Sequence, residues 1–387
     1  MNNRWFVLGV LFAVRLTMAF QFQSVAAVAP LLGPAFGVGL ADIGVLIGLY
    51  FTPGIALALP GGAIGQRFGD RRTMHAALLL MFVGELAMAL SPAWPIQVAG
   101  RLVSGAGGVM LNVQMTKMVA DWFTGKEIAS AMGIFVNSWP AGIALSLITL
   151  PLIGSASGIG AVYLAVAASI AVALAVFALL YHPPAKETTI AATSSWPDRN
   201  ALMAVIVAGL IWGLFNVGFA TVFSFGPSML ADRGWSAAAA GSITSIVLWL
   251  AVVSVPLGGL LADRSGRPNL ILIGGCVVGA LAMIALARSD SVLLIVTIYG
   301  VIIGLPAGPI MSLPARVLRP QTRSLGMGVF YTLYYGTMML GPALAGACAK
   351  WSGSITSAFD FGGATLLACP LLLMGFYRLP RSMPNSA

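Results

Sequence analysis

The chain has 387 residues, of which 59% are hydrophobic and only 8% are charged, and its mean hydropathy is +0.96. Soluble domains carry about 25% charged residues, so this composition excludes a soluble protein. The net charge of +9 would suggest a nucleic-acid partner in a soluble chain, but here the positions of the basic residues must be considered first.

Apolar segments of about 20 residues, the length that spans a hydrocarbon core about 30 Å thick, follow one another along the whole chain. The first is too long for a signal peptide and has no small-residue cleavage pattern, so we expect it to be retained as a helix. We predict an all-α membrane protein with twelve transmembrane helices, at residues 5–32, 41–64, 73–91, 95–120, 127–150, 158–181, 200–225, 236–261, 269–287, 291–315, 323–347 and 355–377.

The longest polar connection, residues 182–199, mixes Pro, Thr, Ser and charged residues, as linkers do. We predict that it is a cytoplasmic linker between an N-terminal bundle of six helices, residues 1–181, and a C-terminal bundle of six, residues 200–387.

Three features recur in the two halves, in the same order and at nearly the same spacing. Such duplicated bundles are typical of transporters, whose substrate site lies between the halves near the bilayer midplane. The pairs are Pro30 with Pro227, the loop Gly62–Arg71 with Gly259–Pro268, and Ala131–Phe135 with Gly326–Phe330, at offsets of 197, 197 and 195 residues.

Basic residues gather in alternate loops. With a cytoplasmic N-terminus, fifteen Lys and Arg residues lie inside and only Arg233, Arg288 and Lys350 lie outside. The positive-inside rule therefore predicts that both termini are cytoplasmic in a multi-pass protein of the cell (inner) membrane. The net charge follows from this topology, and no nucleic-acid partner is expected.

Three ionisable residues, Arg15, Glu85 and Arg101, lie deep within the predicted helices of the N-terminal half. Each costs about 2.5 to 3.5 kcal/mol to insert, so each is a functional candidate. Arg15 is about ten residues into the first helix, which is about halfway across the core, and Gln23 lies at the edge of its helical stripe. The planar guanidinium suits a carboxylate-like or linear anion. We predict that both residues bind substrate; the alternative for Arg15 is a structural pair with Glu85 or a helix-end carbonyl.

Arg101 and Asn112 share one face of the fourth predicted helix with two glycines. They are further candidates for substrate binding, although a structural role is the stronger interpretation for Arg101. Glu85 either pairs with Arg101, which we favour, or carries a coupling proton.

We predict no charge deep within the helices of the C-terminal half, which instead has aromatic and amide residues. Trp212 stands at the position equivalent to Arg15 at the offset of 197. These side chains could wall the apolar part of a cargo or simply fill the bundle. The substrate-binding candidates in this half are Trp212, Asn216, Tyr331 and Tyr334.

The repeated basic loops, in a chain of six plus six helices with cytoplasmic termini, resemble those of the major facilitator superfamily. The resemblance covers the whole chain and implies two bundles that alternate access to a central site, with the loops acting as a latch. The second loop matches the family pattern, whereas the first has Gln66 where an acid is expected and Asp70 where a base is expected, so we expect it to pair differently. The latch residues implied are Gly62, Arg67, Gly69, Asp70, Arg71, Gly259, Asp263, Arg264, Gly266 and Arg267.

Within that superfamily, the segment Arg15–Leu32 is similar to the first helix of the cyanate and nitroimidazole transporter branch. The fourth predicted helix and the Trp122–Phe123 pair that follows resemble nitrate/nitrite carriers. The arginines that such carriers have in helices 2 and 8 are missing here.

We therefore predict a secondary active transporter that moves a small anionic solute by alternating access, as a monomer in the lipid bilayer, with a proton as the candidate coupling ion. The first alternative is a proton-coupled drug antiporter, which would depend on Glu85. The second, from another class, is a non-transporting receptor or scaffold. We expect no enzyme, metal or cofactor, because His75 and His182 lie near helix ends without accompanying groups and the three cysteines lack ligand spacing.

Overall fold

The computed structural model describes residues 3–38, 40–124, 127–182, 195–235 and 237–379. Every regular element in these ranges is helical, which confirms the predicted all-α fold. Most of the predicted linker, residues 183–194, lies outside the described residues, as do the side chains of Pro30, Gln66 and Pro227 and the surroundings of Gly62.

The N-terminal half differs from the prediction at three points. The first predicted helix is broken at Val28, and the second is broken at residues 49–51. The fifth and sixth run on as one helix, with a non-helical residue at Gly158. The helices are α1 (Arg4–Ala27), α2 (Ala29–Phe36), α3 (Leu40–Gly48), α4 (Thr52–Phe68), α5 (Asp70–Leu90), α6 (Trp94–Trp122) and α7 (Ile128–Leu180).

In the C-terminal half, the tenth predicted helix, 291–315, is the one that departs from the prediction. It is divided into two α-helices and a 3-10 turn by a stretch containing Gly304 and Pro306, since proline removes a backbone donor and disrupts a helix interior. The elements are α8 (Arg199–Asp232), α9 (Ala237–Ser265), α10 (Pro268–Leu286), α11 (Val292–Ile303), α12 (Ala307–Ser312), η2 (Pro314–Arg316), α13 (Pro320–Ser352) and α14 (Thr356–Arg378).

Nine helices in the described ranges are long and apolar enough to cross a membrane. The long helices α6 and α13 are not among these nine. Both carry polar residues that the sequence marks as site candidates, including Arg101 and Asn112 in α6 and Tyr331 in α13. The candidate site therefore draws on the least apolar of the long helices.

The chain divides into two compact units. Unit 1 contains residues 1–123, 138–196 and 320–332, and unit 2 contains residues 124–137, 197–319 and 333–387. These units follow the predicted halves except for 124–137 and 320–332, each of which belongs to the unit of the opposite half. The boundary at 182–199 stays a prediction.

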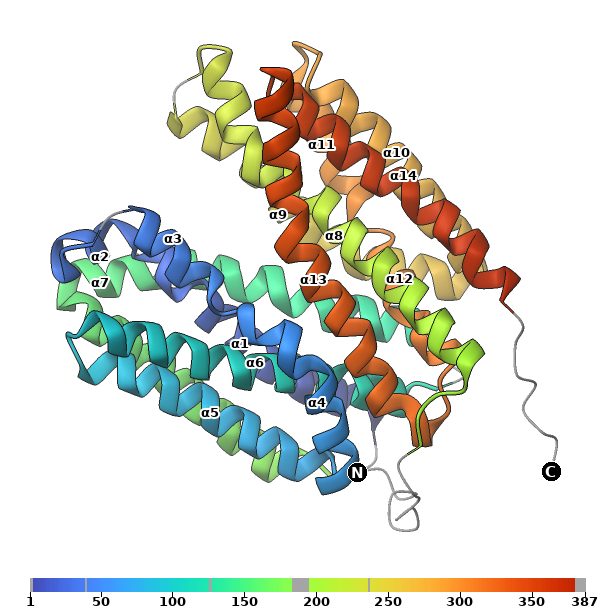
Figure 1. The fold of residues 1–387 in the computed structure, drawn as a ribbon, viewed down its shortest axis with the longest axis horizontal. Helices are drawn as coiled ribbons and strands as arrows, with labels where there is room; N and C mark the ends of the chain where they lie inside the picture. The colour runs from blue at the N-terminus through green and yellow to red at the C-terminus, as the bar shows by residue number, and fades with distance from the viewer. Residues whose placement is uncertain (1–2, 39, 125–126, 183–194, 236, 380–387) are drawn as a thin grey trace. The chain divides into compact units, whose positions relative to one another are not determined.

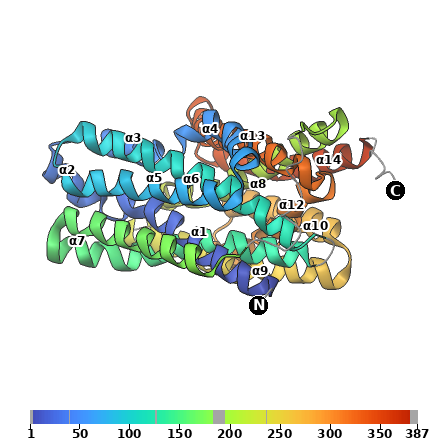
Figure 2. The same ribbon diagram turned by 90° about the horizontal axis from the view of Figure 1, so that it is seen from below.

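Small residues allow close helix packing inside each unit. In unit 1, α5 lies beside α6 (Figures 1 and 2), and a Cβ added at Gly84 would lie 2.5 Å from the Gly100 carbonyl oxygen. In unit 2, α8 lies beside α14, and a Cβ at Gly218 would lie 2.5 Å from the side chain of Leu366. Such contacts are typical of membrane helices, whose association depends on close backbone approach.

The third pair of repeated segments makes the same contact in both units. A Cβ at Gly133 in unit 2 would lie 3.0 Å from the Val255 carbonyl oxygen. A Cβ at Gly328 in unit 1 would lie 2.9 Å from the Ala58 carbonyl oxygen. Ala58 and Val255 are 197 residues apart, the same offset as the repeated loop, so the duplication seen in the sequence extends to the packing.

Candidate functional site

Arg15 is buried in unit 1, where three helices meet around its guanidinium. Its side chain is 5% exposed. Nε donates to Asn112 Oδ1 of α6 at 3.0 Å, and Nη1 donates to Ser138 Oγ of α7 at 3.2 Å. Both acceptors are neutral, so they orient the guanidinium without adding negative charge. The structure thus brings together two predicted candidates, Arg15 and Asn112, and adds Ser138.

A tyrosine of the C-terminal half belongs to the same unit. Tyr331 of α13 is buried, and its hydroxyl lies 2.7 Å from Thr116 Oγ1 of α6. Thr116 in turn donates to the Asn112 carbonyl oxygen at 2.8 Å. The predicted candidate Tyr331 is therefore connected with the Arg15 site through one turn of α6.

Aromatic rings lie beside Arg15 within unit 1. The Arg15 guanidinium carbon is 5.9 Å from the ring centroid of Trp139. Trp139 is next to Phe22 and Phe51, with centroid separations of 5.1 and 5.9 Å. The prediction assigned the aromatic wall to the C-terminal half and did not include these three residues. Helical spacing places Phe22 on the same stripe of α1 as Arg15, but it could not reveal Phe51 and Trp139, because these come from the α3–α4 junction and α7.

Gln23 is a predicted site residue of α1 that the structure does not link to Arg15. It is half-buried in α1, and no polar contact of its side chain exists among the described residues. Its neighbour Phe22 contributes to the aromatic cluster instead.

Arg101 is completely buried and donates to backbone oxygens. Nε donates to Leu46 of α3 at 3.2 Å, and the two terminal nitrogens donate to Gln21 and Phe22 of α1 at 3.0 and 2.5 Å. Its guanidinium also lies 4.7 Å from the Tyr50 ring centroid. These contacts hold α1, α3 and α6 together, as expected from the structural interpretation of Arg101.

Glu85 of α5 is fully buried and contacts α1. Gln21 Nε2 donates to Glu85 Oε2 at 2.9 Å, and Ser24 Oγ lies 3.4 Å from Oε1. In the described part of the chain, no direct ion pair joins Glu85 to Arg101. Gln21 connects them, because its backbone carbonyl oxygen accepts a hydrogen bond from Arg101 and its side-chain amide donates one to Glu85.

The other three candidates of the C-terminal half, Trp212, Asn216 and Tyr334, lie together in unit 2. The Trp212 ring is 5.7 Å from Phe215 and 6.1 Å from Tyr334, centroid to centroid. Asn216 donates to the Trp212 carbonyl oxygen at 2.7 Å. The structure brings Trp212, Asn216 and Tyr334 together as predicted neighbours, while their role in binding stays a prediction.

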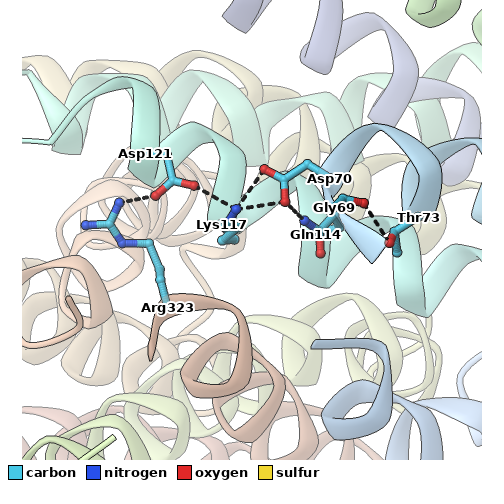
Figure 3. A network of polar contacts seen from close by, with 7 residues as sticks. All are labelled: Gly69, Asp70, Thr73, Gln114, Lys117, Asp121 and Arg323. Atoms are coloured by element: carbon cyan, nitrogen blue, oxygen red, sulfur yellow. Dashed lines mark hydrogen bonds and ion pairs between the residues drawn. The ribbon is translucent and has the colours of Figure 1, made fainter. Parts of the chain in front are cut away.

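The first repeated loop leads into a chain of charges in unit 1 (Figure 3). Lys117 Nζ lies 2.7 Å from both carboxylate oxygens of Asp70 and 3.1 Å from Asp121 Oδ2. Asp121 also pairs with Arg323 of α13, and Asp70 accepts from the Gln114 amide. Arg323 is 2% exposed, so the Asp121 carboxylate compensates the charge of a buried guanidinium. Lys117, Asp121 and Arg323 were not singled out from the sequence.

Other residues of the first loop lie at the surface. Gly69 has a φ of 81°, a left-handed value that glycine adopts without strain, and it allows Asp70 to begin α5. Arg67 is exposed, with its guanidinium 5.5 Å from the Phe68 ring centroid. Arg71 is also exposed and donates to the Ala178 carbonyl oxygen of α7 at 3.0 Å.

The second repeated loop makes a different contact in unit 2. Asp263 Oδ2 accepts from the backbone N–H of Ser130 at 2.7 Å, in the first turn of α7. A carboxylate there satisfies an unpaired donor and interacts favourably with the helix dipole. A Cβ at Gly259 would lie 2.4 Å from the Ala129 carbonyl oxygen, so glycine is needed for this approach. Arg264, Gly266 and Arg267 are exposed.

The family is decided by the match to a family model described as Major Facilitator Superfamily, which covers residues 11–229 and 201–387. The chain belongs to the major facilitator superfamily. The predicted membership is confirmed, and this superfamily member is a multi-pass membrane protein.

Curated relatives of this superfamily member match at low identity. The cyanate transport protein CynX of Escherichia coli is 24% identical over 68% of this chain and 68% of its own length. The nitrate/nitrite transporter NrtP of Nostoc punctiforme is 26% identical, but over 44% of this chain and only 36% of its own length. A protein of Agrobacterium vitis described as a tartrate transporter is 25% identical over 49% of this chain and 41% of its own length. The chain therefore spans less than half the length of two of these relatives.

A solved structure supports the fold of the superfamily member. The transporter FucP in its outward conformation superposes with a TM-score of 0.80 over 95% of this chain and 98% of that chain. The sequence identity is 12%, so this likeness concerns the fold alone.

Proposed function

We propose that this protein is a secondary active transporter of a small anion and that Arg15 binds the negative charge of its cargo. The observation that carries the proposal is a deeply buried guanidinium that Asn112 and Ser138 orient from two other helices. An arginine held by neutral oxygens supplies positive charge in a region of low dielectric, where it favours an anion. The named cargoes of the cyanate and nitrate/nitrite relatives support the same class of substrate.

The test is uptake by purified protein in liposomes, with cyanate, nitrate and small carboxylates offered as cargo. We expect Arg15→Gln to abolish uptake and Glu85→Gln to retain the exchange of labelled for unlabelled cargo. The matched control is Arg288→Gln, because Arg288 is half exposed and pairs with Asp360. If Arg15→Gln transports normally while Glu85→Gln does not, the proton-coupled drug antiporter is the better description. If no solute undergoes exchange, the receptor or scaffold alternative is favoured.

For the transport cycle, we propose that the two repeated loops are latches that close one side of the carrier. The first would act through Asp70, Lys117, Asp121 and Arg323, and the second through Asp263 on the start of α7. A buried charge network is costly to break, because removing one partner leaves another charge uncompensated. When a latch opens, water must therefore solvate the charged groups that these contacts now pair.

We further propose a monomer in the inner membrane, with both termini cytoplasmic and a proton as the coupling ion. The alternate distribution of basic loops supports the orientation. For Glu85, we propose a charge-compensating link to Arg101 through Gln21; a role in proton coupling is the competing assignment.

A further inference from the structure

Three aromatic side chains of unit 1 form a compact aromatic cluster beside Arg15. The centroids of Phe22 and Phe51 are 4.7 Å apart, and Trp139 lies 5.1 Å from Phe22 and 5.9 Å from Phe51. The interplanar angles are 31 to 33°, so the three rings are tilted against one another. Another flat apolar group binds favourably to the faces and edges of such rings.

Two consecutive residues of α7 place the aromatic cluster beside Arg15. Ser138 accepts a hydrogen bond from Arg15, and the next residue is Trp139, whose ring centroid is 5.9 Å from the guanidinium carbon. A ligand whose negative group binds to Arg15 can therefore also contact the Trp139 ring with the rest of its body.

Burial and charge distinguish this aromatic cluster from ordinary core packing. Phe22, Phe51 and Trp139 are all half-buried, whereas Phe135 of α7 and Phe330 of α13 are fully buried. Besides Arg15, a second buried guanidinium lies near the cluster, because Arg101 is 5.9 Å from the Phe22 centroid. A face turned to lipid would not be flanked by two buried cations, since charge next to hydrocarbon is costly.

We infer that the cargo is an organic anion with a flat apolar body, of the class of aromatic carboxylates, and that Trp139, Phe22 and Phe51 hold that body while Arg15 holds the carboxylate. This inference rests on the proposed function of Arg15 and specifies its substrate class. A nitrate or cyanate ion would gain little from aromatic rings, because it has almost no apolar surface to bury. A benzoate-like ion gains both ring contact and burial.

The experiment measures dissociation constants on purified full-length protein for a series of equal charge: nitrate, acetate, cyclohexanecarboxylate and benzoate. Stabilisation against heat gives the affinity, since a ligand that binds the folded state raises its stability. We expect the wild type to bind benzoate at least about tenfold more tightly than acetate, a ratio equivalent to about 1.4 kcal/mol. Cyclohexanecarboxylate should fall between them, because it has the apolar surface without the flat ring.

Two substitutions of Trp139 distinguish the loss of an aromatic ring from a general disturbance of the fold. Trp139→Leu should bring the benzoate and acetate constants to within about twofold of each other, whereas Trp139→Phe should restore most of the preference. The control is Trp249→Leu, because Trp249 is 55% exposed in α9 of unit 2. It should leave all four constants unchanged.

The outcomes distinguish this inference from the proposal on which it rests. Equal binding of acetate and benzoate by the wild type, or an unchanged ratio in Trp139→Leu, overturns the aromatic inference even if Arg15→Gln loses every anion. Normal anion binding in Arg15→Gln overturns the proposed function. If none of the four anions stabilises the wild type, both are overturned.

Discussion

At the scale of single residues, two buried arginines of unit 1, Arg15 and Arg101, differ in what they bind. Arg101 donates to three backbone oxygens, one of them in the last turn of α3, where helix carbonyls have no intrahelical partner. Arg15 instead donates to the side chains of Asn112 and Ser138. We interpret Arg101 as part of the framework and Arg15 as the exchangeable site.

The first prediction compares the two arginines. Arg101→Gln should lower the thermal midpoint of the purified protein by several degrees, because it removes the links between α1, α3 and α6 and leaves the buried Leu46 carbonyl oxygen without this donor, at about 1 to 3 kcal/mol. Arg15→Gln should change the midpoint of the ligand-free protein much less and abolish the stabilisation by anions. Equal losses of thermal stability in both variants would contradict the distinction.

The second prediction concerns Glu85. If its role is to compensate Arg101, Glu85→Gln should lower thermal stability while uptake still responds to an imposed pH gradient as in the wild type. The measurement is uptake into liposomes with and without that gradient, together with the thermal midpoint. A variant that still exchanges cargo but no longer accumulates it with the gradient would instead assign proton coupling to Glu85.

At the scale of elements, glycine positions decide how closely the helices of unit 1 approach. A Cβ at Gly105 of α6 would lie 2.3 Å from the Tyr50 carbonyl oxygen and 3.0 Å from its Cα. These are backbone atoms, so relief requires the α3–α4 junction to move. A Cβ at Gly9 of α1 would meet nothing within 4 Å.

The third prediction uses this matched pair. Gly105→Ala should destabilise the protein by about 1 to 3 kcal/mol, because overpacking displaces backbone. Gly9→Ala should be neutral or slightly stabilising, since alanine favours helix over glycine by about 1 kcal/mol. The thermal midpoints of the two variants in the same detergent measure the difference, and a loss of stability in Gly9→Ala similar to that in Gly105→Ala would argue against the packing explanation.

Most helices could be predicted from hydropathy, but their interruptions could not. Apolar residues continue across Val28 and across residues 49–51, so the average over a window hides the breaks. Pro53 and Pro306 were the available signals. In place of the predicted loop at 151–157, α7 has a single non-helical residue, Gly158, with a φ of 80°, which the composition of the surrounding segment does not reveal.

The residues of the candidate site could be predicted only where a single helix shows an unusual residue on its own. Arg15 and Asn112 are polar residues in apolar helices, so each stands out alone. Ser138 and Trp139 contact Arg15 from 123 and 124 residues further along the chain. A single sequence has no measure of such long-range contacts, and neither residue type is unusual in a membrane helix.

At the scale of the whole molecule, Asp121 is the residue through which the first loop reaches a segment from the other half. It lies between Lys117 and Arg323 (Figure 3). Without its carboxylate, the buried guanidinium of Arg323 would lose the charge that compensates it. Opening around α13 would then be favoured, because water can solvate that charge.

The fourth prediction follows from this. In a protein whose native cysteines are replaced, Asp121→Asn should increase the rate at which Ser324→Cys reacts with a membrane-impermeant maleimide on the side of the basic loops, because Ser324 is only 1% exposed while Asp121 pairs with Arg323. Ser195→Cys, at an exposed position, should react at the same rate with and without Asp121→Asn. An unchanged rate at Ser324→Cys would mean that Asp121 does not restrain this segment.

The repeated glycine contact follows the rule of a two-fold interface between identical subunits, in which residue i of one copy meets residue j of the other, and j meets i. Gly133 of the first half contacts Val255 of the second, and Gly328 of the second half contacts Ala58 of the first. Since Gly133 corresponds to Gly328 and Ala58 to Val255, one substitution in a six-helix homodimer would alter both contacts at once. In this fused chain each contact can change alone, so the two sides of the interface are free to acquire different strengths.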